Sequence, residues 1–120
     1  MGAGLVGAVT VGVYPTSPTN EVAYVVGHAD IEIVVCEDQE QTDKVLGALR
    51  EGNGLPHLEH IFCVDMKGLR RYEAGRPHAF AHLLELGDQL VSEDPEAERR
   101  LDAQIDALVP DDVNILVYTS

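Results

Sequence analysis

The chain has 120 residues, 45% of them hydrophobic and 5% aromatic, so it can form at most one domain with a mainly aliphatic core. Eight basic residues against 21 acidic residues give a net charge of −13, which argues against nucleic-acid backbones and anionic membranes as partners. The longest apolar stretch, Ala3 to Tyr14, is interrupted by glycines and is shorter than the ~20 residues that a membrane span requires. No basic residue precedes Lys44, so a secretory signal is not expected either.

The first part of the chain predicts a strand followed by a helix. The β-branched run VTVGVY, residues 9–14, is typical of a buried strand, and Pro15 ends it. Ser17 and Pro18 then predict the N-cap and first turn of a helix. The apolar face of that helix follows spacings of three and four residues, at Val22, Val25, Val26 and Ala29.

The next segment repeats the alternation. EIVVC, residues 32–36, predicts a second strand, and Asp38 with Gln41 predicts a capping box that opens a second helix. The glycines at residues 52–54 are expected to end this helix. IFCV, residues 61–64, predicts a third strand. The apolar stripe of the helix consists of Val45, Leu46, Ala48 and Leu49.

The second half of the chain is less regular. Residues 66–78 carry several basic side chains and are predicted to form a solvated loop, and residues 80–90 a short helix weakened by Gly87. Asp94 and Pro95 predict the start of a clearer helix. Residues 113–118, VNILVY, predict a short strand that is buried on both faces. The apolar positions of the clearer helix are Ala97, Leu101, Ile105 and Leu108.

Strands and helices that alternate with short connections predict a parallel sheet with right-handed crossovers. The expected fold class is therefore α/β, in the form of one flavodoxin-like, three-layer β-α-β-α-β unit with about four strands over residues 1–120. Cys36 and Cys63 lie in strand-like segments, so they are predicted to be reduced core residues of a cytoplasmic protein.

Two hydroxyl residues follow the last predicted strand. The side chains of Thr119 and Ser120 would stand at the carboxyl end of a parallel strand, where α/β proteins bind phosphate oxygens or help to hold Mg²⁺. The simpler interpretation is that they form the polar end of a strand.

An acidic group gives a second hypothesis. Glu37, Asp38 and Asp65 end predicted strands, and with Thr119 they could meet at one edge of the sheet, like the Mg²⁺ site of a response-regulator receiver. Such a receiver also requires a lysine on a further strand, which is not present, and helix capping already accounts for Asp38. This hypothesis is therefore the weaker one.

Histidine and cysteine spacing predicts no metal site and no nucleophile. His57 and His60 are three residues apart in a segment that Pro56 makes a loop, and His78 and His82 are four apart, but neither pair has a cysteine nearby. The chain also lacks the motif context of a Ser-His-Asp or Cys-His nucleophile.

Three segments resemble a known family. DDVNILVYTS, residues 111–120, resembles the approach to the phosphate-binding loop of AMP-forming acyl-CoA synthetases, and residues 7–30 and 37–46 are similar to the bacterial long-chain fatty-acid ligase branch. The resemblance implies an enzyme that adenylates a fatty acid with ATP and Mg²⁺ and then forms a thioester with CoA. It also implies that Thr119 and Ser120 are the first two residues of the ATP phosphate-binding motif.

The resemblance further implies an internal piece of the amino-terminal domain. The Gly-Thr-rich loop with its lysine, the nucleotide-contacting motifs and the lid lysine are absent, so no residue of this chain is expected to be catalytic by itself. Open sheet edges and aliphatic side chains such as Leu5, Val6 and Val9 favour a homodimer. The alternative is a stand-alone flavodoxin-like or receiver-like binding or signalling module.

Overall fold

The computed structural model describes residues 2–51, 54–73 and 76–119. The chain divides into two compact units: a central unit of residues 13–84, and a terminal unit of residues 1–12 and 85–120. The boundary falls within helix α4 (Phe80–Glu93). The strands of both units pair in parallel and alternate with helices, which confirms the predicted α/β class. That all 120 residues form a single unit stays a prediction.

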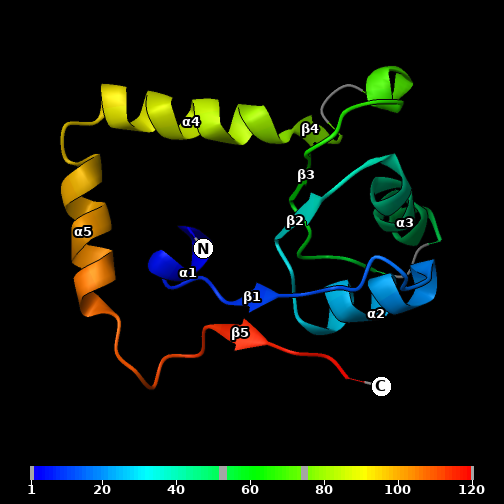
Figure 1. The fold of residues 1–120 in the computed structure, drawn as a ribbon, viewed down its shortest axis with the longest axis horizontal. Coiled ribbons are helices and arrows are strands. Elements are labelled where there is room, and N and C mark those ends of the chain that lie inside the picture. The colour runs from blue at the N-terminus through cyan, green and yellow to red at the C-terminus, as the bar shows by residue number, and fades with distance from the viewer. Residues whose placement is uncertain (1, 52–53, 74–75, 120) are drawn as a thin grey trace. The chain divides into compact units, whose positions relative to one another are not determined.

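The central unit is built on a three-stranded parallel sheet in the order β2–β3–β4 (Figure 1). Its strands are β2 (Ile33–Cys36), β3 (His60–Cys63) and β4 (His78–Ala79). Helix α2 (Thr19–His28) precedes β2, and helix α3 (Gln39–Arg50) connects β2 to β3. The register aligns Ile33 with His60 and Phe62 with His78, so each crossover returns the chain to a neighbouring parallel strand.

The core of the central unit lies between one face of this sheet and helices α2 and α3. Alternation along β2 and β3 directs Cys36, Ile61 and Cys63 to the helices, and all three are buried. From the helices, the residues at spacings of three and four complete the cluster: Val22, Val26, Val45 and Ala48. The predicted apolar faces of both helices are therefore confirmed.

The opposite face of the central sheet is much less covered. Ile33 is 51% exposed and Val35 is 52% exposed, although both are large aliphatic residues on a strand. Val64, directly after β3, is 60% exposed. Phe62, which is aligned with Val35 on this face, is only 4% exposed and lies beside the rings of His60 and His78. The exposed part of this face is therefore formed by β2 and by Val64, and substitutions can test how little it contributes to stability.

The start of α3 agrees with its predicted cap. Asp38 is the N-cap, and its Oδ1 accepts a hydrogen bond from the Gln41 backbone N–H at 3.1 Å. The Gln41 side chain does not complete the reciprocal box; its Oε1 accepts from Lys44 Nζ at 3.2 Å. The helix ends at Arg50, with Glu51 as its C-cap. Gly52 and Asn53, which were expected to end it, lie outside the described residues.

The terminal unit contains α1 (Gly2–Leu5), β1 (Thr10–Val11), α5 (Ala97–Ala107) and β5 (Ile115–Leu116). β1 and β5 form a two-stranded parallel sheet in which Thr10 is aligned with Ile115 and Val11 with Leu116. Both strands are shorter than predicted. The prediction that the last strand is buried on both faces is wrong, because Ile115 is 59% exposed and Leu116, which points to the opposite face, is 39% exposed.

The ends of two helices differ from the predicted positions. Helix α2 begins at Thr19 with Pro18 as N-cap, while the Ser17 N–H donates to the Tyr14 carbonyl in the preceding turn. Helix α5 begins at Ala97, because the Asp94 carboxylate accepts from the Glu96 N–H at 2.9 Å and so closes a turn first.

The segment predicted as a solvated loop is partly ordered. It contains a 3₁₀ helix, η1 (Leu69–Arg71), and the start of β4, whose His78 is aligned with Phe62. Leu69 is only 3% exposed, so this segment is anchored in the core of the central unit. The helix that follows, α4, has 14 residues and continues through Gly87, whereas a short helix was expected.

Candidate functional site

The predicted phosphate-binding residues follow β5. Thr119 is exposed after this strand, and Ser120 lies outside the described residues. Neighbouring elements of the terminal unit hold the strand in place. The Asn114 carbonyl accepts a hydrogen bond from the Thr10 N–H at 2.9 Å and another from Thr10 Oγ1 at 3.1 Å. Two hydrogen bonds therefore connect β1 to the residue just before β5.

The approach to β5 is also ordered. The Asp112 N–H donates to the Val109 carbonyl at 3.0 Å, and Asp112 Oδ2 accepts from the Val109 N–H at 2.9 Å. These two bonds close the turn that leads into the strand. A Cβ on Gly4 would lie 2.8 Å from Asn114 Oδ1, so glycine allows α1 to approach this segment closely.

An exposed threonine at the end of a parallel strand suits the chemistry predicted for it. Its hydroxyl can donate to a phosphate oxygen, or its oxygen can contribute to the coordination of Mg²⁺, which prefers hard oxygen ligands. Stabilising the charge that develops during phosphoryl or adenylyl transfer requires several positioned donors or cations. Thr119 is therefore suited to binding, and the assignment of Thr119 and Ser120 stays a prediction.

The acidic residues of the central unit are engaged in local structure. The Asp65 N–H donates to the Glu37 carbonyl at 2.9 Å, and Asp65 Oδ1 accepts from the Lys67 N–H at 2.9 Å. Asp38 caps α3. In the part of the chain that the structure describes, no group of three or more His, Cys, Asp or Glu side chains is placed to hold a metal ion. Thr119 belongs to the terminal unit, so its convergence with these residues stays a prediction.

The histidines contact carboxylates and other rings. His57 Nε2 lies 3.5 Å from Asp30 Oδ1. The rings of His78 and His82 have their centroids 5.5 Å apart, and His78 also lies 5.8 Å from the ring of Phe62. His78 belongs to β4 and His82 to α4, so this pair does not share a helix.

The two cysteines are cross-strand neighbours, which the sequence analysis did not anticipate. Cys36 and Cys63 are aligned in the β2–β3 register, and both are free and buried. Burial is the main cause that raises the pKa of the Cys36 thiol. Both cysteines therefore belong to the core, as predicted, with thiols that are poor nucleophiles in the folded state.

With the geometry established, comparison with known proteins identifies the family. The family model described as "AMP-binding enzyme" matches residues 1–120. The chain belongs to the AMP-binding enzyme family. Over 114 residues it is 27% identical to long-chain-fatty-acid–CoA ligase ACSBG1 of Rattus norvegicus, a match that covers 95% of this chain and 14% of that protein.

Two further relatives extend this comparison. The human ACSBG1 ligase is 25% identical over 114 residues, which again cover 95% of this chain and 14% of the ligase. An uncharacterised protein of Mycobacterium tuberculosis is 40% identical over 65 residues, which cover 54% of this chain and 33% of that protein. The chain thus spans about one seventh of the ligases it matches. No solved structure matches it significantly. Among the described residues, no helix is long and apolar enough to cross a membrane.

Proposed function

We propose that this chain is a segment of the amino-terminal domain of a long-chain fatty acyl-CoA synthetase of the bacterial branch. The observation that carries the proposal is the family match over residues 1–120, together with the similarity to the ACSBG1 ligases across 95% of the chain. The parallel β-α-β arrangement of the central unit is consistent with such a domain. The whole protein acts in the cytoplasm.

The whole protein catalyses ATP-dependent adenylation of a fatty acid, followed by thioester formation with CoA. Thr119 and Ser120 open its phosphate-binding loop, and the Thr119 hydroxyl donates to a phosphate oxygen of ATP. Mg²⁺, when bound with ATP, supplies charge neutralisation for the phosphates. The role of the described chain is to deliver this hydroxyl at the end of β5, a strand that β1 holds by backbone pairing.

The test begins with the reading frame. A coding sequence that continues past codon 120 into a Gly-Thr-rich loop ending in Pro-Lys-Gly is expected, and a stop codon there would contradict the proposal. The encoded protein should then support fatty-acid-dependent exchange between ATP and pyrophosphate, whereas the 120-residue chain alone should give none above a no-protein control.

Substitution of Thr119 tests its role. A hydrogen bond to a charged group contributes roughly 1.5–3 kcal/mol, so Thr119→Ala should slow exchange by about tenfold or more in the encoded protein. Thr16→Ala is the matched control, because Thr16 is an exposed threonine in a turn of the central unit. Equal activity of the two variants would contradict a phosphate contact by Thr119.

We further propose that the 120-residue chain forms a homodimer through exposed apolar surface. Ile33, Val35 and Val64, on or beside the outer face of the central sheet, are each more than half exposed. Their burial is favourable by about 25 cal/mol per Å². The net charge of −13 opposes this association at low salt, so the dimer should gain population as salt is added. Light scattering across a salt series is the measurement, and a folded monomer at every salt concentration would contradict it.

A further inference from the structure

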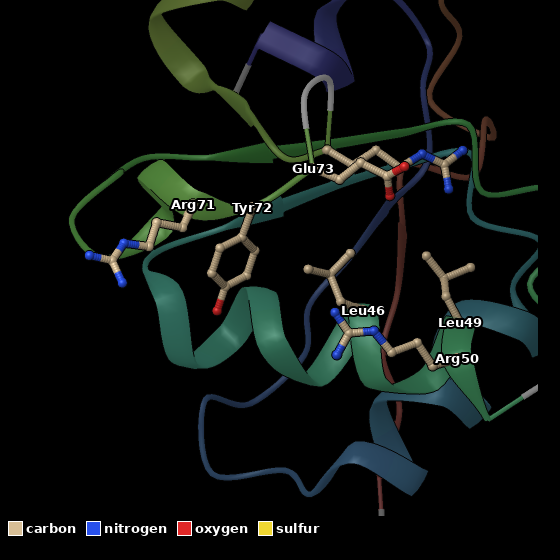
Figure 2. Close-up of a pocket in the computed structure, with 7 residues that line it drawn as sticks. Leu46, Leu49, Arg50, Arg71, Tyr72 and Glu73 are labelled. Carbon is tan, nitrogen blue, oxygen red and sulfur yellow. The ribbon is translucent and has the colours of Figure 1, made fainter.

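A cavity of about 540 Å³ opens beside α3 in the central unit (Figure 2). One wall is the carboxyl-terminal half of α3, which contributes Leu46, Leu49 and Arg50. The other wall is the segment around the end of η1, which contributes Arg71, Tyr72, Glu73 and Arg76. Its volume lies within the ~300–1,000 Å³ that is typical of small-molecule sites.

The lining of this cavity is strongly cationic for so acidic a chain. Three of the eight basic residues line it, against the single carboxylate of Glu73. Lysine and arginine form three ion pairs among the described residues, namely Lys44–Glu40, Arg99–Glu96 and Arg100–Asp94. None of these ion pairs uses an arginine of the cavity. The Arg71 side chain points away from Arg50 on the far side of Tyr72 (Figure 2), which leaves Arg50 and Arg76 as the candidates for binding one external anion.

Hydrogen bonds to Tyr72 hold the two walls together. The Tyr72 hydroxyl donates to Asp43 Oδ1 at 2.5 Å and accepts from Gln39 Nε2 at 3.0 Å, and both partners lie on α3. The bond to Asp43 is the main cause that raises the pKa of Tyr72. Leu69 adds an anchor in the core. Because Arg71 and Glu73 flank Tyr72 in the chain, these bonds fix their backbone beside the helix.

The second wall begins with a turn at Gly68. Gly68 has a φ of +85°, and a Cβ at this position would lie 2.0 Å from Gln39 Oε1, the end of a flexible side chain that can move aside. The positive φ is the reason that glycine is favoured where the chain turns into η1. The wall is thus positioned by the turn at Gly68, by burial at Leu69 and by hydrogen bonds at Tyr72.

The cavity combines an apolar floor with charged sides. In Figure 2, Leu46 and Leu49 rise from α3 towards the opposite wall, Arg50 bends back along the helix below Leu46, and Arg71 lies beyond Tyr72. Leu46 and Leu49 are partly buried and pack against the core, so their remaining surface is fixed. The site can therefore accept a ligand that has both an anionic and an apolar part.

The charge of the ligand decides how strongly the arginines attract it. The lining holds three guanidinium groups and the Glu73 carboxylate, and the Asp43 carboxylate lies next to it, bonded to Tyr72. A phosphate monoester carries a charge of about −1.5 to −2 at neutral pH, so a guanidinium group attracts it more strongly than a singly charged anion. A carboxylate ligand carries only half of that charge. Guanidinium groups also bind phosphate oxygens through paired, planar N–H donors.

We propose that this cavity binds an organic phosphate monoester, with the phosphate held by Arg50 and Arg76 and the apolar group resting on Leu46 and Leu49. The proposal does not depend on the adenylation reaction, since Thr119 belongs to the terminal unit and contributes nothing to this lining. Its failure and the failure of the proposed synthetase function are therefore distinguishable.

The test compares four ligands by calorimetry and by amide NMR shifts of the 120-residue chain. 1-Naphthyl phosphate is the probe, inorganic phosphate lacks the apolar group, 1-naphthoate replaces the phosphate by a carboxylate, and 1-naphthol carries no charge. The phosphate ester is expected to bind at least about tenfold more tightly than each of the other three. Binding should weaken as salt is added, and the amide signals of Leu46, Leu49 and Tyr72 should shift.

Arginine substitutions locate the site. Arg50→Gln and Arg76→Gln should each weaken the binding of 1-naphthyl phosphate by about tenfold. Arg70→Gln is the matched control, because Arg70 is exposed on the same segment but does not line the cavity; it should leave the affinity within about twofold. All three side chains are exposed, so the variants should fold.

Three results would overturn the proposal. One is the absence of saturable binding of the phosphate ester at millimolar concentrations. A second is equal affinity for inorganic phosphate or for 1-naphthoate. The third is an equal loss of affinity in the Arg70→Gln control, which would mean that binding reflects diffuse surface charge.

Discussion

The unequal faces of the central sheet predict that the same substitution will have very different costs on neighbouring strands. Ile61 is 2% exposed on β3 and packs under α3 with Val45 and Ala48. Ile61→Ala removes three carbon atoms, which at about 0.8 kcal/mol each is roughly 2.4 kcal/mol of lost transfer free energy. The residual cavity raises the expected loss of unfolding free energy to about 3–4 kcal/mol. Small domains are typically stable by only ~5–15 kcal/mol, so this loss should be easily measured.

Ile33→Ala is the matched control on the adjacent strand. Ile33 is 51% exposed on the outer face, so its truncation should cost less than about 1 kcal/mol. Urea unfolding followed by far-UV circular dichroism is the suitable assay, because the chain has no tryptophan. Running it at two protein concentrations separates folding from association, since a dimer would make the Ile33→Ala cost rise with concentration. Equal costs of both substitutions at low concentration would refute the difference in burial between Ile61 and Ile33.

Three further outcomes follow from local contacts. Asp38→Ala should destabilise the chain by about 1 kcal/mol in the same urea assay, because the α3 cap is lost, whereas Asp38→Asn should retain most of that stability. Cys36 and Cys63 should not react with a thiol reagent until the chain unfolds, since both are buried and burial raises the pKa of Cys36; rapid reaction of the folded protein would contradict this. Asp94 should titrate in an NMR series below its ordinary pKa, because it accepts a hydrogen bond from Arg100, and Arg100→Gln should raise that pKa. The lowered pKa stabilises the fold at pH values above the unfolded-state pKa, and this contribution is lost as pH falls through the folded-state pKa.

The helices of the central unit could be predicted because their signals are local. The cap at Asp38 depends on a residue three positions away, and the apolar stripe of α3 repeats within two turns. The parallel pairing of β2 and β3 could also be predicted, because a helix between two strands leaves few alternatives to a right-handed crossover. These features require no knowledge of the distant parts of the chain.

The features that were missed depend on distant partners. β4 has two residues and no alternating pattern of its own, and it is a strand because its backbone pairs with Phe62 and Cys63. The apolar run of residues 113–118 is typical of a buried strand, yet β5 pairs over only two residues and exposes Ile115. Hydrophobicity along the chain reports what a segment can bury, whereas the exposed fraction depends on which elements pack against it.

The cationic cavity could not have been predicted from composition. A net charge of −13 argues against large polyanionic partners, but the basic residues are unevenly distributed, with six of the eight in residues 13–84. The sequence places Arg50 at the end of a predicted helix, and Arg71 and Arg76 in a predicted loop. They line the same cavity because Tyr72 donates a hydrogen bond to Asp43, 29 residues earlier in the chain, which holds the loop segment against the helix. Since exposed charges more than about 10 Å apart are largely screened at 0.1 M salt, the arginines that line the cavity act on a bound anion more strongly than the acidic residues farther away do.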